Sequence, residues 1–337
     1  MHSVSLPNRL IPARTSVNTL SSLASRVLKG DRKAVSRAIT LVENREKGYS
    51  TLLRYLYPHT GKASMIGITG PPGTGKSSLL DKLVKMYRAG GKKVAVLAVD
   101  PSSPLSGGAI LGDRLRMLSH TLDEGVYIRS MASRGDMGGL SRAARNAVRI
   151  LDAAGNDIVF VETVGIGQSE VEIVKIAPTI LVVLMPELGD EIQAIKAGLM
   201  EIGDIFVVNK SDLPGADKVV YNLQPVLSSR EGWNQVIVKV SAKTSQGLDE
   251  LVSNIDAHTR FVAGTQIERA KLEQKLTDEL LENVTRDVTS DIRAKLCKSD
   301  LLRSLLLKLV ERKIDPETAS EALLETYLEK DRARKRK

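Results

Sequence analysis

Seven short apolar runs, separated by helical patterns, limit the folds that this chain can adopt. Most of them are rich in Val, Ile and Leu at consecutive positions, which is typical of strands buried on both faces of a parallel sheet. The runs cover residues 65–69, 94–99, 127–130, 158–161, 179–185, 205–208 and 236–240. Because these runs alternate with helical patterns, we predict an α/β domain over residues 63–262, with a doubly wound, mostly parallel sheet flanked by helices.

The chain before this domain has the apolar spacing of helices and no strand pattern. Asp31 follows a glycine and can cap a helix, and Pro58 ends the last helical pattern. We therefore expect a helical N-terminal extension over residues 1–62, with helices at residues 17–28, 32–46 and 49–57.

The chain after the domain is also helical in pattern. An apolar residue recurs every four positions from Leu272 to Leu296, with charged residues between, and this stripe must be buried against something. Two shorter helical patterns follow. We predict a helical arm with a basic tail over residues 263–337, with further helices at 301–310 and 316–328.

Composition excludes several classes of protein. The 337 residues are 42% apolar and 26% charged, as in folded globular chains. The longest apolar run, residues 180–185, is far too short to span a bilayer, so we expect no membrane segment. Nearly half of the net charge of +9 lies in the C-terminal tail and aromatic residues are only 3%, so we expect no nucleic-acid partner. One cysteine fits a reducing compartment, and we expect a cytoplasmic protein.

Residues 70–77 match the phosphate-loop pattern G-x-x-x-x-G-K-[ST], with a predicted strand before it and a helix after it. The glycines allow backbone N–H groups to surround an anion at the start of the helix. In such loops the lysine reaches the β- and γ-phosphates and the hydroxyl binds Mg²⁺. The predicted nucleotide-binding residues here are Gly70, Pro71, Pro72, Gly73, Thr74, Gly75, Lys76, Ser77 and Ser78.

A second motif indicates which base is bound. Asn209, Lys210 and Asp212 form an N-K-x-D pattern after a predicted strand, and a carboxylate at 212 can accept two hydrogen bonds from guanine but none from adenine in that arrangement. Residues Ser241, Ala242 and Lys243 follow the next strand and are similar to the S-A-K element of GTPases. Since open α/β sheets bind ligands at the carboxyl ends of their strands, we predict that GTP or GDP binds there.

Acidic residues at two other strand ends are candidate metal ligands. Asp100 and Glu162 each end a predicted strand, and either can hold Mg²⁺ directly or through water, together with Ser77. Asp100 precedes a proline and can alternatively serve only to start a turn. A purely structural role is less expected for Glu162 than for Asp100. Without a metal ion, the apolar strand before Glu162 would end on an acid that has no partner.

Three further residues are candidate catalytic groups beside Lys76 and Glu162. Asp113 can be a second catalytic carboxylate or simply an acid at the start of a helix. Gln168 can orient the attacking water or lie in solvent. Lys196 can act in the reaction or be an ordinary surface lysine.

Taken together, these motifs resemble the MeaB/ArgK family, the GTPase chaperones of adenosylcobalamin-dependent methylmalonyl-CoA mutase. The resemblance covers residues 63–262 motif by motif and the flanking helices only in layout. Beside N-K-S-D and S-A-K, it is carried by G-P-P-G-T-G-K-S-S at 70–78, V-D-P-S-S at 99–103, G-D-R-L-R-M at 112–117, R-G-D-M-G-G-L at 134–140 and E-T-V-G-I-G-Q-S-E at 162–170.

The resemblance implies a Mg²⁺-dependent GTPase that gates cofactor loading into the mutase and protects or reactivates it. It implies slow GTP hydrolysis that the mutase stimulates, and a homodimer joined through the C-terminal helices. It places Ser77, Asp100 and Glu162 around Mg²⁺, makes Asp113 a switch residue needed for catalysis, and makes residues 186–196 a third switch.

Three alternatives remain. A metallochaperone GTPase would need metal-ligating Cys and His residues, which are few and scattered here. A kinase or ATPase linked to transport of basic amino acids would need adenine recognition, for which N-K-S-D presents the wrong hydrogen-bonding groups. A scaffold gated by the nucleotide would bind GTP without depending on its hydrolysis.

Overall fold

The computed structural model describes residues 17–101, 120, 122–133, 139–163, 173–186, 198–230, 232–263, 266–296 and 299–335. The chain divides into two compact units, Met1–Glu268 and Arg269–Lys337, and each is considered by itself. The boundaries at residues 62/63 and 262/263 that the sequence suggested stay predictions.

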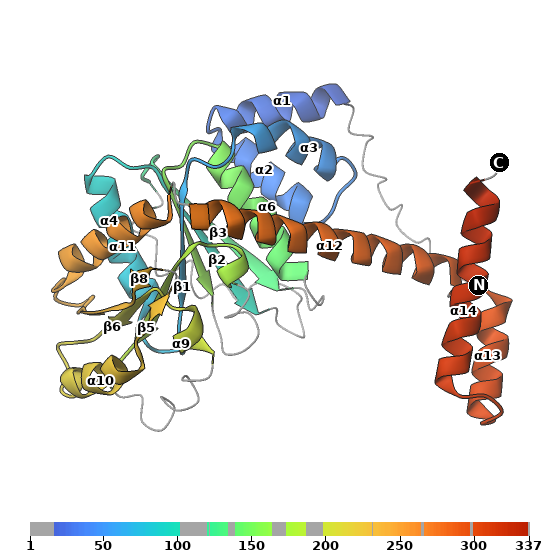
Figure 1. Ribbon diagram of the computed structural model, residues 1–337. Coiled ribbons are helices and arrows are strands. Elements are labelled where there is room, and N and C mark those ends of the chain that lie inside the picture. Colours follow the sequence, from blue (N-terminus) through green and yellow to red (C-terminus); the bar gives the residue numbers. More distant parts are fainter. Residues whose placement is uncertain are drawn as a thin grey trace, which may run out of the picture. The chain divides into compact units, whose positions relative to one another are not determined.

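The first unit contains a parallel sheet. Over the described residues it has seven strands in the order β3-β2-β4-β1-β5-β6-β9 (Figure 1). All six strand pairs are parallel, which confirms the predicted doubly wound α/β fold. A two-stranded antiparallel ribbon, β7 (Ser229–Arg230) with β8 (Trp233–Asn234), lies outside it. The sheet strands are β1 Ser64–Thr69, β2 Val94–Pro101, β3 Val126–Ser133, β4 Ile158–Thr163, β5 Thr179–Leu184, β6 Ile205–Val208 and β9 Val236–Lys239.

Helices cover both faces of the sheet. One face packs against α4 (Lys76–Ala89) and α11 (Leu248–Val262), whose buried leucines share a cluster with β1. The opposite face packs against α6 (Gly139–Ala153), α9 (Leu199–Ile202) and α10 (Ala216–Leu223). Successive residues of β2 divide between the two clusters: Val94 and Val96 face α4, while Ala95, Leu97 and Val99 face α6. The strands are therefore apolar at consecutive positions because both of their faces are buried.

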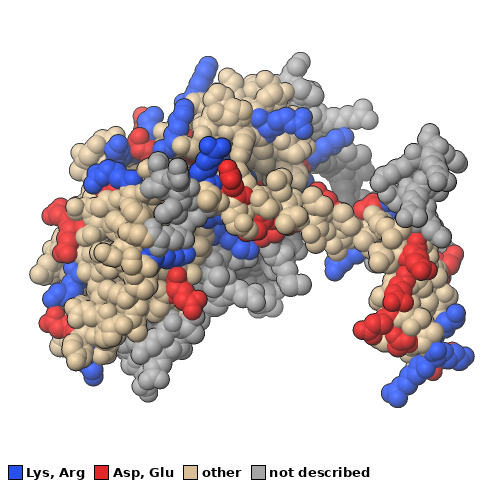
Figure 2. All heavy atoms as spheres, in the orientation of Figure 1, with Lys and Arg blue, Asp and Glu red and all other residues tan. Residues whose placement is uncertain are grey.

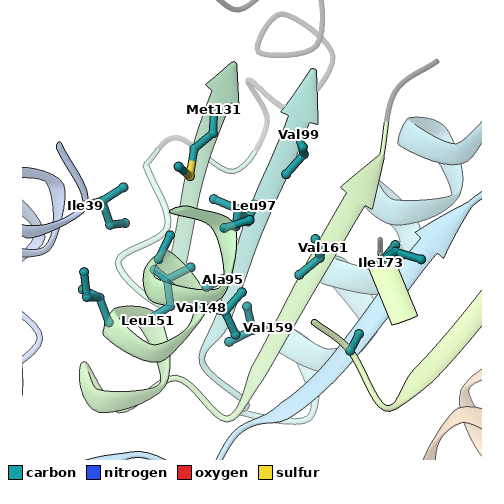
Figure 3. Packing of buried hydrophobic residues seen from close by; sticks show 14 of the residues in the cluster. Ile39, Ala95, Leu97, Val99, Met131, Val148, Leu151, Val159, Val161 and Ile173 are labelled. Atoms are coloured by element: carbon teal, nitrogen blue, oxygen red, sulfur yellow. The ribbon is translucent and has the colours of Figure 1, made fainter. Parts of the chain in front are cut away.

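The N-terminal helices share this core. They are α1 (Val17–Leu28), α2 (Arg32–Glu43), α3 (Tyr49–Leu56) and the single turn η1 (Tyr57–His59). All four pack against α6. Figure 3 shows Ile39 of α2 in the same cluster as Val148 and Leu151 of α6 and the strand residues beneath them. The extension is thus part of the compact first unit.

The second unit is helical. It holds most of α12 (Gln266–Leu296), with α13 (Asp300–Val310) and α14 (Pro316–Lys335). Ser299 and Asp315 accept backbone N–H groups at the starts of α13 and α14. The hydroxyl of Tyr327 donates to Asp291 at 2.9 Å and so joins α14 to α12. No helix among the described residues has both the length and the apolar character needed to cross a bilayer.

Candidate nucleotide site

The sequence motifs meet at the carboxyl edge of the sheet. The phosphate loop leaves β1, and Glu162 near the end of β4 pairs in register with Ile68 of β1 and with Ala98 of β2. Asn209 follows β6 and Ser241 follows β9. Because all these strands are parallel, their carboxyl ends lie at one edge, where open α/β sheets bind ligands.

The phosphate loop has a backbone that requires glycine. Gly70, Gly73 and Gly75 have φ values of 135°, 81° and 86°, which side chains rarely adopt. A Cβ at Gly70 would also overlap the backbone carbonyl of Val183. Gly75 stands immediately before α4, so unpaired N–H groups at the start of this helix border the loop. This is the geometry of an anion-binding loop.

Lys76 is buried and its side chain runs back along the loop. Its ammonium group donates to the carbonyl oxygens of Gly70 at 2.6 Å and Pro71 at 3.0 Å. The hydroxyl of Thr74 donates to the same Pro71 carbonyl at 2.9 Å. The positive charge of Lys76 is thus held against the backbone at the start of the loop, while Pro72 and Ser78 are exposed.

Two oxygen-bearing side chains lie together at the end of the phosphate loop. The hydroxyl of Ser77 donates to Oε1 of Glu162 at 2.8 Å, and Glu162 is only 1% exposed. A hydroxyl and a carboxylate are the hard oxygen donors that Mg²⁺ prefers, so these residues fit the expected metal. The backbone of Asp100 lies near the end of β2, paired with Ala132, and its side chain is outside the described part.

The guanine motif is tied to the phosphate loop by Asn209. Its amide nitrogen donates to the carbonyl of Thr74 at 2.8 Å, and its amide oxygen accepts the N–H of Ala242 at 3.1 Å. Asn209 is 1% exposed, so the geometry of these bonds is fixed by its surroundings. Lys210 has a φ of 57° and contacts the sulfur of Met185 at 3.3 Å. The three loops therefore form one connected structure.

Asp212 is exposed and held in place by its neighbour. The hydroxyl of Ser241 donates to its Oδ1 at 2.6 Å. This hydrogen bond, with smaller contributions from Lys243 and Lys210, lowers the pKa of Asp212 below its ordinary value. The carboxylate is therefore ionised near neutral pH and has acceptor capacity left for a ligand.

The sequence motifs did not indicate some contacts that support this site. The buried hydroxyls of Thr69 and Thr163 hydrogen-bond at 3.1 Å and so join the phosphate loop to the segment after Glu162. The ammonium of Lys82 donates to Ser245 at 3.1 Å and joins α4 to the loop after β9. The threonine pair could have been predicted from the sequence only because β1 and β4 each end on a residue with a hydroxyl group. The predicted catalytic residues Asp113, Gln168 and Lys196 lie outside the described residues.

Comparisons with known proteins agree with this geometry. Residues 35–296 match the model of the family described as methylmalonyl Co-A mutase-associated GTPase MeaB. A Pyrococcus horikoshii protein named as a GTPase is 46% identical over 312 residues, which cover 91% of this chain and 98% of that one. The GTPase ArgK of Escherichia coli is 36% identical over 270 residues, covering 77% of this chain and 82% of that one.

A mouse relative and a solved crystal structure are also similar to this chain. The mouse protein named methylmalonic aciduria type A homolog, mitochondrial, is 35% identical over 246 residues, covering 67% of this chain and 59% of that one. A crystal structure described as LAO/AO transport system kinase has a TM-score of 0.68 and 28% identity, covering 96% of this chain and all of that one. The chain is a GTPase and belongs to the family of methylmalonyl-CoA mutase-associated GTPases, the MeaB family.

Proposed function

We propose that the connected loops at the carboxyl edge of the sheet bind GTP with Mg²⁺. The observation that carries this proposal is the double hydrogen bond of Asn209, which holds the phosphate loop and the guanine loop as one site. In this proposal the backbone of residues 70–77 surrounds the phosphates. Asp212 accepts the guanine N1–H and 2-amino groups, and the loop at Ser241–Lys243 borders the base.

The chemistry of this site is phosphoryl transfer to water by positioning and charge. Lys76 exchanges its two carbonyl acceptors for phosphate oxygens when these enter the loop. Ser77 and Glu162 would hold Mg²⁺, which would supply positive charge to the phosphate oxygens. Asp113, Gln168 and Lys196 remain proposed catalytic residues on the strength of the motifs alone.

We further propose that GTP hydrolysis gates cofactor loading into an adenosylcobalamin-dependent methylmalonyl-CoA mutase, in the cytoplasm. The family description and the name of the mouse relative support this association. A bound partner can speed hydrolysis by ordering the site or by adding a positive charge, as activating proteins do for other GTPases.

The test is the rate of GTP hydrolysis with and without purified methylmalonyl-CoA mutase. We expect the mutase to raise the rate at least about tenfold, a modest gain beside the ~10³–10⁵-fold that an arginine finger supplies in other GTPases. The Lys76→Ala variant with mutase is the control and should stay slow. An unchanged rate in the wild-type protein would instead favour a scaffold whose nucleotide hydrolysis is incidental.

A transport-linked kinase is the second candidate, because the similar crystal structure is described as a kinase. The two functions differ in base preference and in the acceptor of the phosphoryl group. Competition between GTP and ATP should show strong preference for GTP. Comparable affinity for both nucleotides, or transfer of labelled γ-phosphate to a molecule other than water, would favour the kinase.

We also propose that the protein is a homodimer joined through its C-terminal helices. Within the second unit, the apolar side chains of α12 are largely exposed in the single chain: Leu272, Leu280, Val284 and Val288 are 54%, 64%, 59% and 44% accessible. Leucine and valine exposed in such numbers on one helix indicate a surface that a partner covers.

A further inference from the structure

A cavity of about 440 Å³ opens to solvent in the first unit, on the N-terminal helices. Its volume lies within the range of about 300–1,000 Å³ that is usual for ligand sites. None of the contacts described above for the nucleotide site involves a residue that lines it. The lining residues come from α3, η1 and α6 and are Ser50, Leu53, Arg54, Leu56, Tyr57, Pro58, Asn146 and Arg149.

The floor of the cavity is fixed by buried residues. Leu56 is 1% exposed and belongs to the main core cluster, against which Leu53 also packs. Asn146 is buried on α6, and its amide oxygen accepts a hydrogen bond from Arg149 at 3.3 Å. The cavity therefore has a stable, mostly apolar floor with few polar groups, which is typical of a binding pocket.

The rim combines an aromatic ring with two cations. Tyr57 is 52% exposed, and the guanidinium of Arg149 lies 5.7 Å from the centre of its ring. Thr60 donates its backbone N–H and its hydroxyl to the carbonyl of Tyr57, which fixes this turn. Arg54 also lines the cavity and is exposed, on α3. Tyrosine and arginine, with tryptophan, are enriched among the residues that dominate binding energy at protein interfaces.

The positive charge at the rim of the cavity indicates what kind of molecule can bind there. None of the described residues that line it is Asp or Glu, and Figure 2 shows Lys and Arg side chains over the N-terminal helices. Residues 1–16 of this chain include Arg9 and Arg14 and no acid, and residues 331–337 carry five bases and one acid. Both segments have the same sign of charge as the rim, so they are poor candidates to fill the cavity.

We infer that the cavity binds an acidic segment of a partner protein. An apolar side chain of that segment fills the floor between Leu53 and Leu56, and a neighbouring carboxylate pairs with Arg54, which is exposed. Arginine suits this purpose because its planar guanidinium binds carboxylates through two parallel hydrogen bonds. The inference goes beyond the proposed GTPase cycle and does not depend on the identity of the mutase partner.

The test uses the full chain and a panel of short labelled peptides. Each peptide carries one Leu or Phe between glutamates, and each has a counterpart with lysines in place of the glutamates. Fluorescence anisotropy should show binding of acidic peptides and none of the lysine counterparts. Binding should weaken as salt rises, because charge pairs at an open rim are screened.

Three variants locate the binding. Arg54→Glu reverses a rim charge and should weaken binding at least about tenfold, as expected for loss of a charge-assisted pair. Ser50→Trp starts from an exposed residue of the lining, fills the cavity and should abolish binding. Lys47→Glu makes the same charge change at an exposed residue outside the lining and should have little effect.

GTP hydrolysis without partner should be the same in all three variants, which shows that each is folded. The inference is wrong if no acidic peptide binds, if the lysine peptides bind as well, or if Arg54→Glu and Ser50→Trp bind like the wild type.

Discussion

The carboxylate of Asp212 offers the most direct test of base recognition. Replacement by Asn keeps the size of the side chain but removes the charge that accepts two donors from guanine. We expect Asp212→Asn to weaken GTP binding by about tenfold or more, the usual loss for hydrogen bonds to a charged group. Xanthosine triphosphate, which has an oxygen in place of the 2-amino group, should compete better than with the wild type.

Titration with a fluorescent GTP analogue and these competitors measures both effects. Thermal unfolding is the control, because Asp212 is exposed and its replacement should not change the melting temperature appreciably. Unaltered GTP affinity in the variant would show that the base is recognised elsewhere.

Glu162 is the residue on which the proposed metal site depends. Glu162→Gln keeps an acceptor for the Ser77 hydroxyl but loses the negative charge. We expect the Mg²⁺ concentration needed for half-maximal GTP hydrolysis to rise about tenfold or more, as for other changes around bound metals. Glu201→Gln, at an exposed acid, is the matched control. The same Mg²⁺ dependence in Glu162→Gln and wild type would remove Glu162 from the metal site.

At the scale of single residues, the sequence indicated the positions that short motifs define and missed those that depend on strand register. Lys76, Asn209 and Asp212 could be placed because their motifs have fixed spacing. The Thr69–Thr163 pair is separated by 94 residues, and it forms because β1 and β4 are adjacent and in register. The order of strands depends on the whole sheet, so the sequence of β1 or of β4 alone does not show that the two are neighbours.

Among the structural elements, the strands were easier to predict than their ends. All seven predicted runs are strands of the sheet, but β3 continues to Ser133 instead of ending at residue 130. It does so because it pairs with β2 over the whole of Val94–Pro101. The second helix was expected to reach residue 46 and ends at Glu43, where Asn44 caps it and Arg45 adopts a φ of 50°. Residues 44–46 include no Gly or Pro that would indicate from the sequence that the helix ends at Glu43.

The four-residue spacing of the apolar residues in α12 did not show on which side of the helix each of them lies. An α-helix turns about 100° per residue, so a strict four-residue repeat advances about 40° at each step. From Leu272 to Leu296 the apolar side chains therefore wind around the helix. This agrees with their unequal burial, since Leu280 is 64% exposed whereas Leu296 is 7% exposed.

Asp152 connects the end of α6 to the segment that enters β1. This carboxylate is 2% exposed and accepts the backbone N–H groups of Gly61, Lys62 and Ala63. Asp152→Ala leaves three donors without their acceptor, and we expect it to lower the free energy of unfolding by about 3 kcal/mol. Urea titration followed by circular dichroism measures this change.

Asp157→Ala is the matched control for Asp152→Ala. The side chain of Asp157 is exposed and accepts one backbone N–H, from Lys93 at 2.7 Å. Water can replace that acceptor, so we expect a loss of about 1 kcal/mol or less. Equal losses in the two variants would show that the buried carboxylate has no special part in holding β1.

His258 makes the junction of α11 with β5 and β6 sensitive to acid. It is 3% exposed and hydrogen-bonds Thr179 at 2.9 Å. Burial, and to a smaller extent the charge of Arg230, lower its pKa to about 4 from 6.5, although Asp204 lies 3.5 Å away and favours the charged form. The unfolded chain therefore binds a proton near pH 6.5, and the folded chain binds it only near pH 4.

Stability from neutral His258 is fully present above pH 6.5 and is lost as the pH falls toward 4. The shift corresponds to at most about 3 kcal/mol over this range. We expect His258→Gln, which keeps a polar group for Thr179, to lose less stability than the wild type between pH 7 and pH 4.5. Urea titrations at several pH values measure the difference. Parallel pH profiles would mean that His258 has the same pKa in the folded and the unfolded chain.

At the scale of the whole molecule, the sequence indicated the layout of strands and helices but not what they bury together. The N-terminal helices were expected as a helical extension, and Ile39 and Leu52 of these helices are completely buried in the cluster that covers one face of the sheet. Both are ordinary apolar residues of amphipathic helices. Their pattern shows that one face of each helix is covered and cannot show by what, because the covering surface on α6 lies about 100 residues further along the chain.

The same reasoning leads to a test of the proposed homodimer. The exposed apolar residues of α12 should be covered by a second copy, which would remove them from water at about 25 cal/mol for each Å² of apolar surface. Replacing both Leu280 and Val284 by Glu in the full chain introduces four carboxylates into a symmetric interface. We expect this double variant to be monomeric by light scattering, while the wild type is dimeric. Thr289→Glu adds a charge at an exposed polar position about 180° around the helix from Leu280 and should remain dimeric. If the double variant is as dimeric as the wild type, the interface lies elsewhere, and the exposed stripe of α12 must be assigned to another partner.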